Sequence, residues 1–115
     1  MRRAKTRSTR RLGDRLVAAL CENDAERRGT FVRDLCEPEM LIVSDGRTST
    51  GLGGLHAAAS EFRTYCAGEL LVPQTPSMIR GLIRFEWRLH DSDRAGTLLV
   101  SQRRARIDAI YLTTR

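Results

Sequence analysis

Hydrophobic residues recur at helical spacing in three parts of the chain. The spacing predicts a first helix from Leu12 to about Asn23, a second over 25–35 that Asp24 can cap, and a third over 55–66. Asn23 suits the left-handed end of the first helix, so the first two helices follow each other almost directly. Helices joined so tightly need a further surface on which to pack.

The second half of the chain changes to the alternation typical of strands. From Ile83 to Leu89, apolar residues alternate with charged ones, and this is the strongest strand signal in the sequence. Weaker signals predict strands at 40–43, 97–101 and 107–113, with the polar segment 45–51 as a loop. The apolar segments 70–72 and 78–82 have two prolines between them, so we expect the strand there to be short, edge-like or interrupted. The loops between the last strands are too short to hold crossover helices, so we expect an antiparallel meander and an α+β fold.

The net charge of +6 comes from the beginning of the chain. Six of the twenty basic residues lie within 1–11, which holds no acidic residue, so fourteen residues of each sign remain from Leu12 onward. We therefore divide the chain into a basic flexible arm over 1–11 and one folded domain over 12–115. From the arm we expect at most a weak, salt-dependent contact with nucleic acid, because it has no scaffold that reads bases.

Cysteine and histidine are too few and too scattered for a metal site or a nucleophilic triad. The three cysteines, at positions 21, 36 and 66, form no C-x-x-C pair, which favours small core residues in a reducing, cytoplasmic compartment. No apolar run is long enough to cross a membrane, and the glycines of 51–54 lack the context of a dinucleotide fingerprint. We expect neither a metal nor a cofactor.

The order of elements and three local sequences resemble the nuclear transport factor two-like superfamily, and its SnoaL-like bacterial members in particular. The matching segments are 15–35 with its Asn-Asp joint, 40–64 with its glycine-started helix, and 82–112, in which RRARIDAI stands at the family's final turn. The resemblance implies a cone-shaped α+β barrel, with three helices packed on a curved, mainly antiparallel sheet around a pocket. Relatives include ketosteroid isomerase, limonene-epoxide hydrolase and SnoaL-type polyketide cyclases, but also domains without catalysis, so the pocket residues must indicate the function.

Two carboxylates are the candidate catalytic residues that the resemblance implies. Asp45 follows the first predicted strand near the family's base position, although Ser-Asp-Gly is also ordinary turn chemistry. Asp108 follows Ile107 at a position that points inward in the family, and the alternative is an aspartate bonded to turn amides or to Arg106. Together the two aspartates would form the acid and base of a SnoaL-type site.

The remaining pocket residues implied by the resemblance are mostly apolar. We expect the ligand pocket to be lined by Leu16, Leu20, His56, Phe85, Trp87, Leu99, Ile110 and Leu112. Leu16 and Thr97 stand where ketosteroid isomerase carries its two acidic donors, so its chemistry is not expected. His56, near the start of the third helix, has a surface or capping role as its alternative.

The alternating strand leaves open which of its faces lines the pocket. If Phe85 and Trp87 face the interior, then Arg84, Glu86 and Arg88 form an outward row that is solvated or contacts another subunit. In the opposite register the charged residues would line the pocket, and burial would require them to pair.

Two classes of function follow. The first is a small-molecule pocket protein, acting without a cofactor as a cyclase, isomerase or hydrolase on a medium-sized apolar substrate through Asp45 or Asp108. It requires an enclosed cavity that holds a carboxylate. The second is a non-catalytic module of the same fold that binds a ligand or forms a homodimer through the sheet face. It requires a small or filled cavity and a broad apolar outer sheet face.

Overall fold

Three helices pack on one face of a curved sheet, and residues along the strands alternate between this buried face and the outer one. The computed structural model describes residues 2–21, 23–67, 71–73, 75–90 and 92–114. In chain order the elements are α1 (Arg2–Cys21), α2 (Ala25–Leu35), β1 (Cys36–Ser44), β2 (Arg47–Thr50), α3 (Gly51–Cys66), β3 (Leu71–Pro73), β4 (Ser77–Ile79), β5 (Leu82–Leu89), β6 (Ala95–Arg103) and β7 (Arg106–Thr114).

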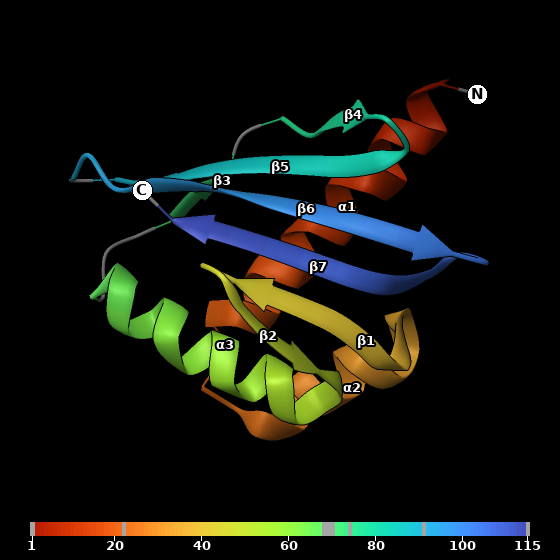
Figure 1. Cartoon of the computed structure of the whole chain (residues 1–115). Coiled ribbons are helices and arrows are strands. Elements are labelled where there is room, and N and C mark those ends of the chain that lie inside the picture. The colour runs from red at the N-terminus through yellow and green to blue at the C-terminus, as the bar shows by residue number, and fades with distance from the viewer. Residues whose placement is uncertain (1, 22, 68–70, 74, 91, 115) are drawn as a thin grey trace.

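The strands form one sheet in the order β2–β1–β7–β6–β5–β3, and β4 pairs with β5 outside this path. The described pairs are antiparallel, apart from the parallel pair of β1 with β7. In Figure 1, α1 crosses behind β6 and β7, while α2 and α3 lie beside β1 and β2. The structure confirms the expected α+β class, with its helices packed on a curved, mainly antiparallel sheet.

The helices follow the apolar pattern except at their N-terminal ends. Asp24 Oδ1 accepts a hydrogen bond of 2.9 Å from the backbone N–H of Glu26, which confirms the predicted cap of α2. α3 begins at Gly51, earlier than expected, because the φ of 66° at this glycine lets the chain turn directly from β2 into the helix. α1 begins at Arg2 and not at Leu12, so the basic segment 2–11 is continuous with the first helix.

Two hairpins lie where the sequence predicted a loop in one segment and a single strand in the other. β2 occupies part of the segment predicted as a loop, and its polar residues conceal it because most of this edge strand is exposed. Its turn consists of Asp45 and Gly46, whose φ values of 47° and 85° belong to the two-residue hairpin turn of type I′. The predicted strand over 78–82 is likewise divided into β4 and β5 by a turn at Arg80 and Gly81.

The inner face of the sheet and the helices share one hydrophobic core. On β5 the apolar residues of the alternating pattern are buried, so the charged row faces outward. α1 rests directly on this strand: a methyl group added to Gly13 would overlap the ring of Phe85, with Cζ at 2.9 Å and two other ring atoms closer still. Side chains therefore fill the space between α1 and β5.

Candidate functional site

Asp45 lies exposed in the β1–β2 turn and links it to the end of β7. Its backbone N–H donates to the Leu112 carbonyl at 3.0 Å. Its carboxylate accepts hydrogen bonds from the backbone N–H of Thr114 at 2.9 Å and from the Thr114 hydroxyl at 2.8 Å. These three bonds fasten the hairpin to the parallel neighbour of β1, which is a structural use of the carboxylate.

Asp108 lies at a bulge that interrupts the alternation of β7. Ser101 of β6 faces Ala109, but Gln102 faces Ile107, so Asp108 is the extra residue between the two pairs. The bulge takes Asp108 out of the two-residue alternation of β7, whereas the resemblance implied an inward position like those of Ile110 and Leu112. The aspartate is half-buried, and its buried Oδ1 has no hydrogen-bond partner within the described ranges. The Arg106 guanidinium bonds to the carbonyls of Arg33 and Cys36 instead.

The structure does not bring these two carboxylates together. Asp45 binds Thr114, which lies six residues beyond Asp108 on the same strand. Six residues of a strand span about 20 Å. The two side chains therefore lie towards opposite ends of β7, too far apart to act on the same bond of a medium-sized substrate.

The predicted lining residues divide between the interior and the outer face. Buried in the core are Leu16, Leu20, Phe85, Trp87, Ile110 and Leu112. Leu99 is half-buried and faces outward, since it pairs with Arg84 on one side and Tyr111 on the other. In the interior set no side chain is more than 5% exposed, so these residues do not line an open, solvent-filled hollow.

His56 supports a buried arginine from the second helix. Arg28 is only 5% exposed, and its Nε donates a hydrogen bond of 2.9 Å to Nδ1 of His56. His56 is thus the acceptor of this hydrogen bond and Arg28 its donor. This pair joins α2 to α3, a contact that nothing in the local sequence of either helix indicates.

An aromatic cluster of Phe62, Tyr65 and Trp87 fills one end of the interior. The Trp87 indole stands edge-on to Phe62, with ring centroids 5.1 Å apart, and to Tyr65, at 5.9 Å. Gly96, the partner of Trp87 on β6, makes room for the indole, because a methyl group there would overlap its ring. The side chain of Arg94 covers Tyr65, with the guanidinium carbon 5.6 Å from the ring centre.

The buried indole N–H of this aromatic cluster lacks a partner among the residues that the structure describes. Trp87 is 2% exposed, and no described residue accepts a hydrogen bond from its Nε1. A buried tryptophan N–H normally finds an acceptor, and leaving one unsatisfied costs about 1–3 kcal/mol. The site therefore offers one hydrogen-bond donor surrounded by aromatic rings.

Of this cluster, the sequence indicated Trp87 as a pocket residue, whereas Phe62, Tyr65 and Arg94 were not among the predicted pocket residues. Tyr65 follows Phe62 by three residues, so the two share a helix face, and this spacing could have indicated the contact. Arg94 reaches Tyr65 from the β5–β6 hairpin through a bond of 2.5 Å to the Tyr65 carbonyl, which no local pattern predicts.

Several solved structures are similar to this one over most of the chain. The structure is similar to a protein from Agrobacterium tumefaciens assigned as an isomerase of the SnoaL-like family, with 27% identity over 90% of this chain and 94% of the other and a TM-score of 0.74. The chain belongs to the NTF2/SnoaL-like superfamily. The designed NTF2 fold protein NT-9 is 15% identical over 94% of this chain and 85% of its own, with a TM-score of 0.68. TerC, crystallised with polyporic acid, is 12% identical over 88% of both chains, with a TM-score of 0.61.

Comparison of the sequence alone finds no narrower family within this superfamily. No protein-family model matches the chain, and no curated protein matches it either. Within the described residues of this NTF2-like protein, no group of histidine, cysteine and acidic side chains could hold a metal ion. Over the same residues, no helix has both the length and the apolar character needed to cross a membrane.

Proposed function

We propose that this NTF2-like protein binds an apolar small molecule that carries one hydrogen-bond acceptor, at the aromatic cluster of Phe62, Tyr65 and Trp87. The observation that carries the proposal is the buried Nε1 of Trp87, which has no acceptor in the described part of the chain. A ketone or ester oxygen placed at this atom would satisfy the donor, while the rings of Phe62 and Tyr65 pack on the apolar body of the ligand.

Tyr65 and Arg94 form the route by which such a ligand enters. Tyr65 is half-buried and Arg94 is exposed, so this side of the cluster faces solvent. Separating the two side chains breaks the cation–π contact, worth about 0.5–1 kcal/mol at an exposed site, and the hydrogen bond from Arg94 to the Tyr65 carbonyl, worth about 0.5–1.5 kcal/mol. Their displacement opens the edge of the indole.

Binding without catalysis fits the positions of the carboxylates. The Asp45 carboxylate accepts two hydrogen bonds from Thr114, and Asp108 lies near the opposite end of β7. The catalytic roles of the two aspartates stay predictions, and they require each aspartate to act without the other. The SnoaL-type arrangement uses two acidic residues together, and the separation of Asp45 from Asp108 does not provide such a pair at Trp87.

Calorimetric titration with 1-tetralone and tetralin tests the proposal, because the two molecules share a carbon skeleton and differ by one carbonyl oxygen. We expect tetralone to bind about tenfold more tightly, the value of one hydrogen bond of about 1.4 kcal/mol. Trp87→Phe should abolish this preference, since phenylalanine keeps a ring but offers no N–H.

Phe62→Leu is the matched control. It removes a ring of the cluster without touching the donor, so it should weaken the binding of both molecules by a similar factor and keep the tenfold preference. If the natural chain binds neither molecule, or if Trp87→Phe keeps the preference, the proposal is wrong.

A second candidate function, a homodimer through the outer face of the sheet, is favoured by one row of residues. Val43, Tyr111, Leu99 and Arg84 are consecutive pairing partners across β1, β7, β6 and β5, and all four are half-buried. Arg84 pairs with Glu86, yet its buried Nε has no acceptor among the described residues. The row combines apolar area with an unsatisfied donor, as interface cores do.

Sedimentation of the natural chain and of Leu99→Lys tests the dimer. Lysine at this position would place a second positive charge beside Arg84 in each subunit of the interface. The repulsion between these charges should convert a dimer into a monomer. Thr113→Lys, at an exposed site near the end of β7, is the control and should leave the association unchanged. A natural chain that sediments as a monomer at high concentration would rule the dimer out.

A further inference from the structure

The positive charge of the chain is concentrated on the N-terminal half of α1. Segment 1–11 holds six basic residues and no acidic one, whereas fourteen residues of each sign remain in the rest of the chain. Since α1 begins at Arg2, nearly all of this segment is part of the first helix. Neither the aromatic cluster nor the outer face of the sheet uses these charges.

The basic residues of this half recur at helical spacing. Four of them share one side of the helix through the spacing i, i+4, i+7 and i+8: Arg3, Arg7, Arg10 and Arg11. The side of α1 that packs in the core is set by its buried residues: Leu12, Leu16, Ala19 and Leu20. Because a helix turns by about 100° per residue, these two sets of positions lie on opposite sides of α1. We call the four arginine positions the basic face.

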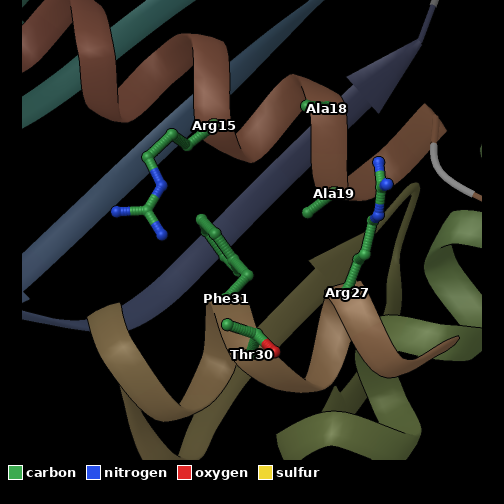
Figure 2. Close-up of a pocket in the computed structure, with 6 residues that line it drawn as sticks. All are labelled: Arg15, Ala18, Ala19, Arg27, Thr30 and Phe31. Carbon is green, nitrogen blue, oxygen red and sulfur yellow. The ribbon is translucent and has the colours of Figure 1, made fainter. Parts of the chain in front are cut away.

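α2 packs beside the C-terminal half of α1. Figure 2 shows the cavity between the two helices, to which α1 contributes Arg15, Ala18 and Ala19. The basic face precedes these residues, and Figure 1 shows that this half of α1 extends away from α2. Arg11, where the two halves meet, is exposed.

Two large apolar side chains are exposed at the same end of the molecule. Met78 and Ile79 of β4 are 57% and 39% exposed, and no other large apolar side chain in the described part of the chain is exposed. Met78 pairs with Ile83, which faces the core, so Met78 belongs to the face of the sheet that carries α1. Arg80, in the turn that follows, is exposed as well. Figure 1 shows β4 and the N-terminal half of α1 at the end of the molecule where β5 begins.

We propose that this end of the molecule binds the surface of a bilayer rich in anionic phospholipid. The basic face and Arg80 attract the headgroup phosphates, while Met78 and Ile79 enter the apolar layer beneath them. A helix with about four to eight basic residues is typical of proteins that bind such surfaces. Nucleic acid would use the charge alone, whereas a bilayer uses both the charge and the exposed apolar pair.

Flotation with lipid vesicles tests the proposal on the natural chain. Vesicles of phosphatidylcholine alone are compared with vesicles of phosphatidylcholine and phosphatidylglycerol in equal amounts. We expect binding to the anionic mixture to be more than about tenfold tighter, and to weaken as salt screens the headgroup charge. Equal binding to both kinds of vesicle, or binding to neither, would overturn the proposal.

Arg3→Gln combined with Arg7→Gln tests the basic face. Glutamine keeps a helix propensity close to that of arginine, so the double variant removes two charges and retains α1. Each charge near an anionic surface contributes about fivefold in affinity, so binding to the anionic mixture should fall by more than about tenfold.

Arg33→Gln combined with Arg88→Gln is the matched control. It removes the same charge from exposed positions on α2 and β5, away from the basic face, and should weaken binding by less than about twofold. If the two double variants weaken binding equally, the net charge of the chain and not the basic face directs the contact, and the proposal is wrong.

Met78→Gln combined with Ile79→Thr distinguishes a bilayer from nucleic acid. Both residues are exposed, so the thermal midpoint should stay unchanged while binding to the anionic mixture falls about tenfold. The natural chain should also bind a DNA duplex less tightly than these vesicles at equal phosphate concentration. Unchanged vesicle binding in this variant, or tighter binding of the duplex by the natural chain, would show that the bilayer is not the partner.

Discussion

Gly13 in α1 is the most sensitive point of the packing between helix and sheet. In an unobstructed helix, Gly→Ala stabilises by about 0.8–1 kcal/mol, because alanine loses less backbone entropy on folding. At Gly13 the added methyl group would overlap the Phe85 ring, which lies on the facing strand β5. Overpacking of this kind costs about 1–3 kcal/mol and outweighs the gain in helix propensity, so we expect Gly13→Ala to lower the free energy of unfolding by up to about 2 kcal/mol.

Urea unfolding followed by circular dichroism measures this change, and Gly53→Ala supplies the control. Gly53 lies in α3, and a methyl group there meets nothing within 4 Å, so this substitution should stabilise the protein. In a double-mutant cycle, Phe85→Leu should relieve much of the penalty of Gly13→Ala, because the two sites touch. If Gly13→Ala stabilises as much as Gly53→Ala, then α1 does not rest on β5 and the described interior is wrong.

Three further outcomes follow from single contacts. Burial raises the pKa of the Cys36 thiol to about 12 against a smaller opposing effect of Arg106, so the folded chain holds this proton more tightly than the unfolded chain with its pKa near 9.0. Stability should therefore be complete below pH 9 and fall above it by up to about 1.4 kcal/mol per pH unit, and urea titrations should show a flatter dependence in Cys36→Ala. Arg106→Gln should lower the thermal midpoint by several degrees, because it removes the cation bonded to the carbonyls at the end of α2, whereas an unchanged midpoint would contradict that role. Asp45→Ala should lower the free energy of unfolding in urea by about 1–2 kcal/mol, because it removes the hydrogen bonds to Thr114 and leaves a residue with a Cβ at positive φ. Asp45→Gly should cost less, because glycine adopts this φ without strain. A larger loss in Asp45→Gly than in Asp45→Ala would refute this account of the turn.

The sequence allowed the fold class and most of the core to be predicted because these depend on repeating local patterns. The alternation of 83–89 predicted β5 and its two distinct faces, of which the structure buries the one with Phe85 and Trp87, and the Asn-Asp joint located the start of α2. β2 could not be found in this way, because an exposed edge strand shows no apolar alternation.

The candidate site depends on contacts between residues that are distant in the chain, which local patterns do not contain. The bulge at Asp108 appears only when β6 and β7 are paired, and it invalidates simple counting along the strand. Arg28 and His56 are 28 residues apart, and Arg94 and Tyr65 are 29 apart. The separation of Asp45 from Asp108 likewise follows from the register of β7 and not from either local sequence.

Nuclear magnetic resonance of the indole N–H tests the central claim most directly, because Trp87 is the only tryptophan in the chain. In a spectrum of the ¹⁵N-labelled protein, this residue contributes one indole signal. A hydrogen bond from Nε1 to a ligand carbonyl should move that proton downfield on addition of 1-tetralone, whereas tetralin should produce no such shift. An indole signal that stays in place while the protein binds tetralone, or that moves equally with tetralin, would contradict the assignment of Trp87 as the ligand's hydrogen-bond donor.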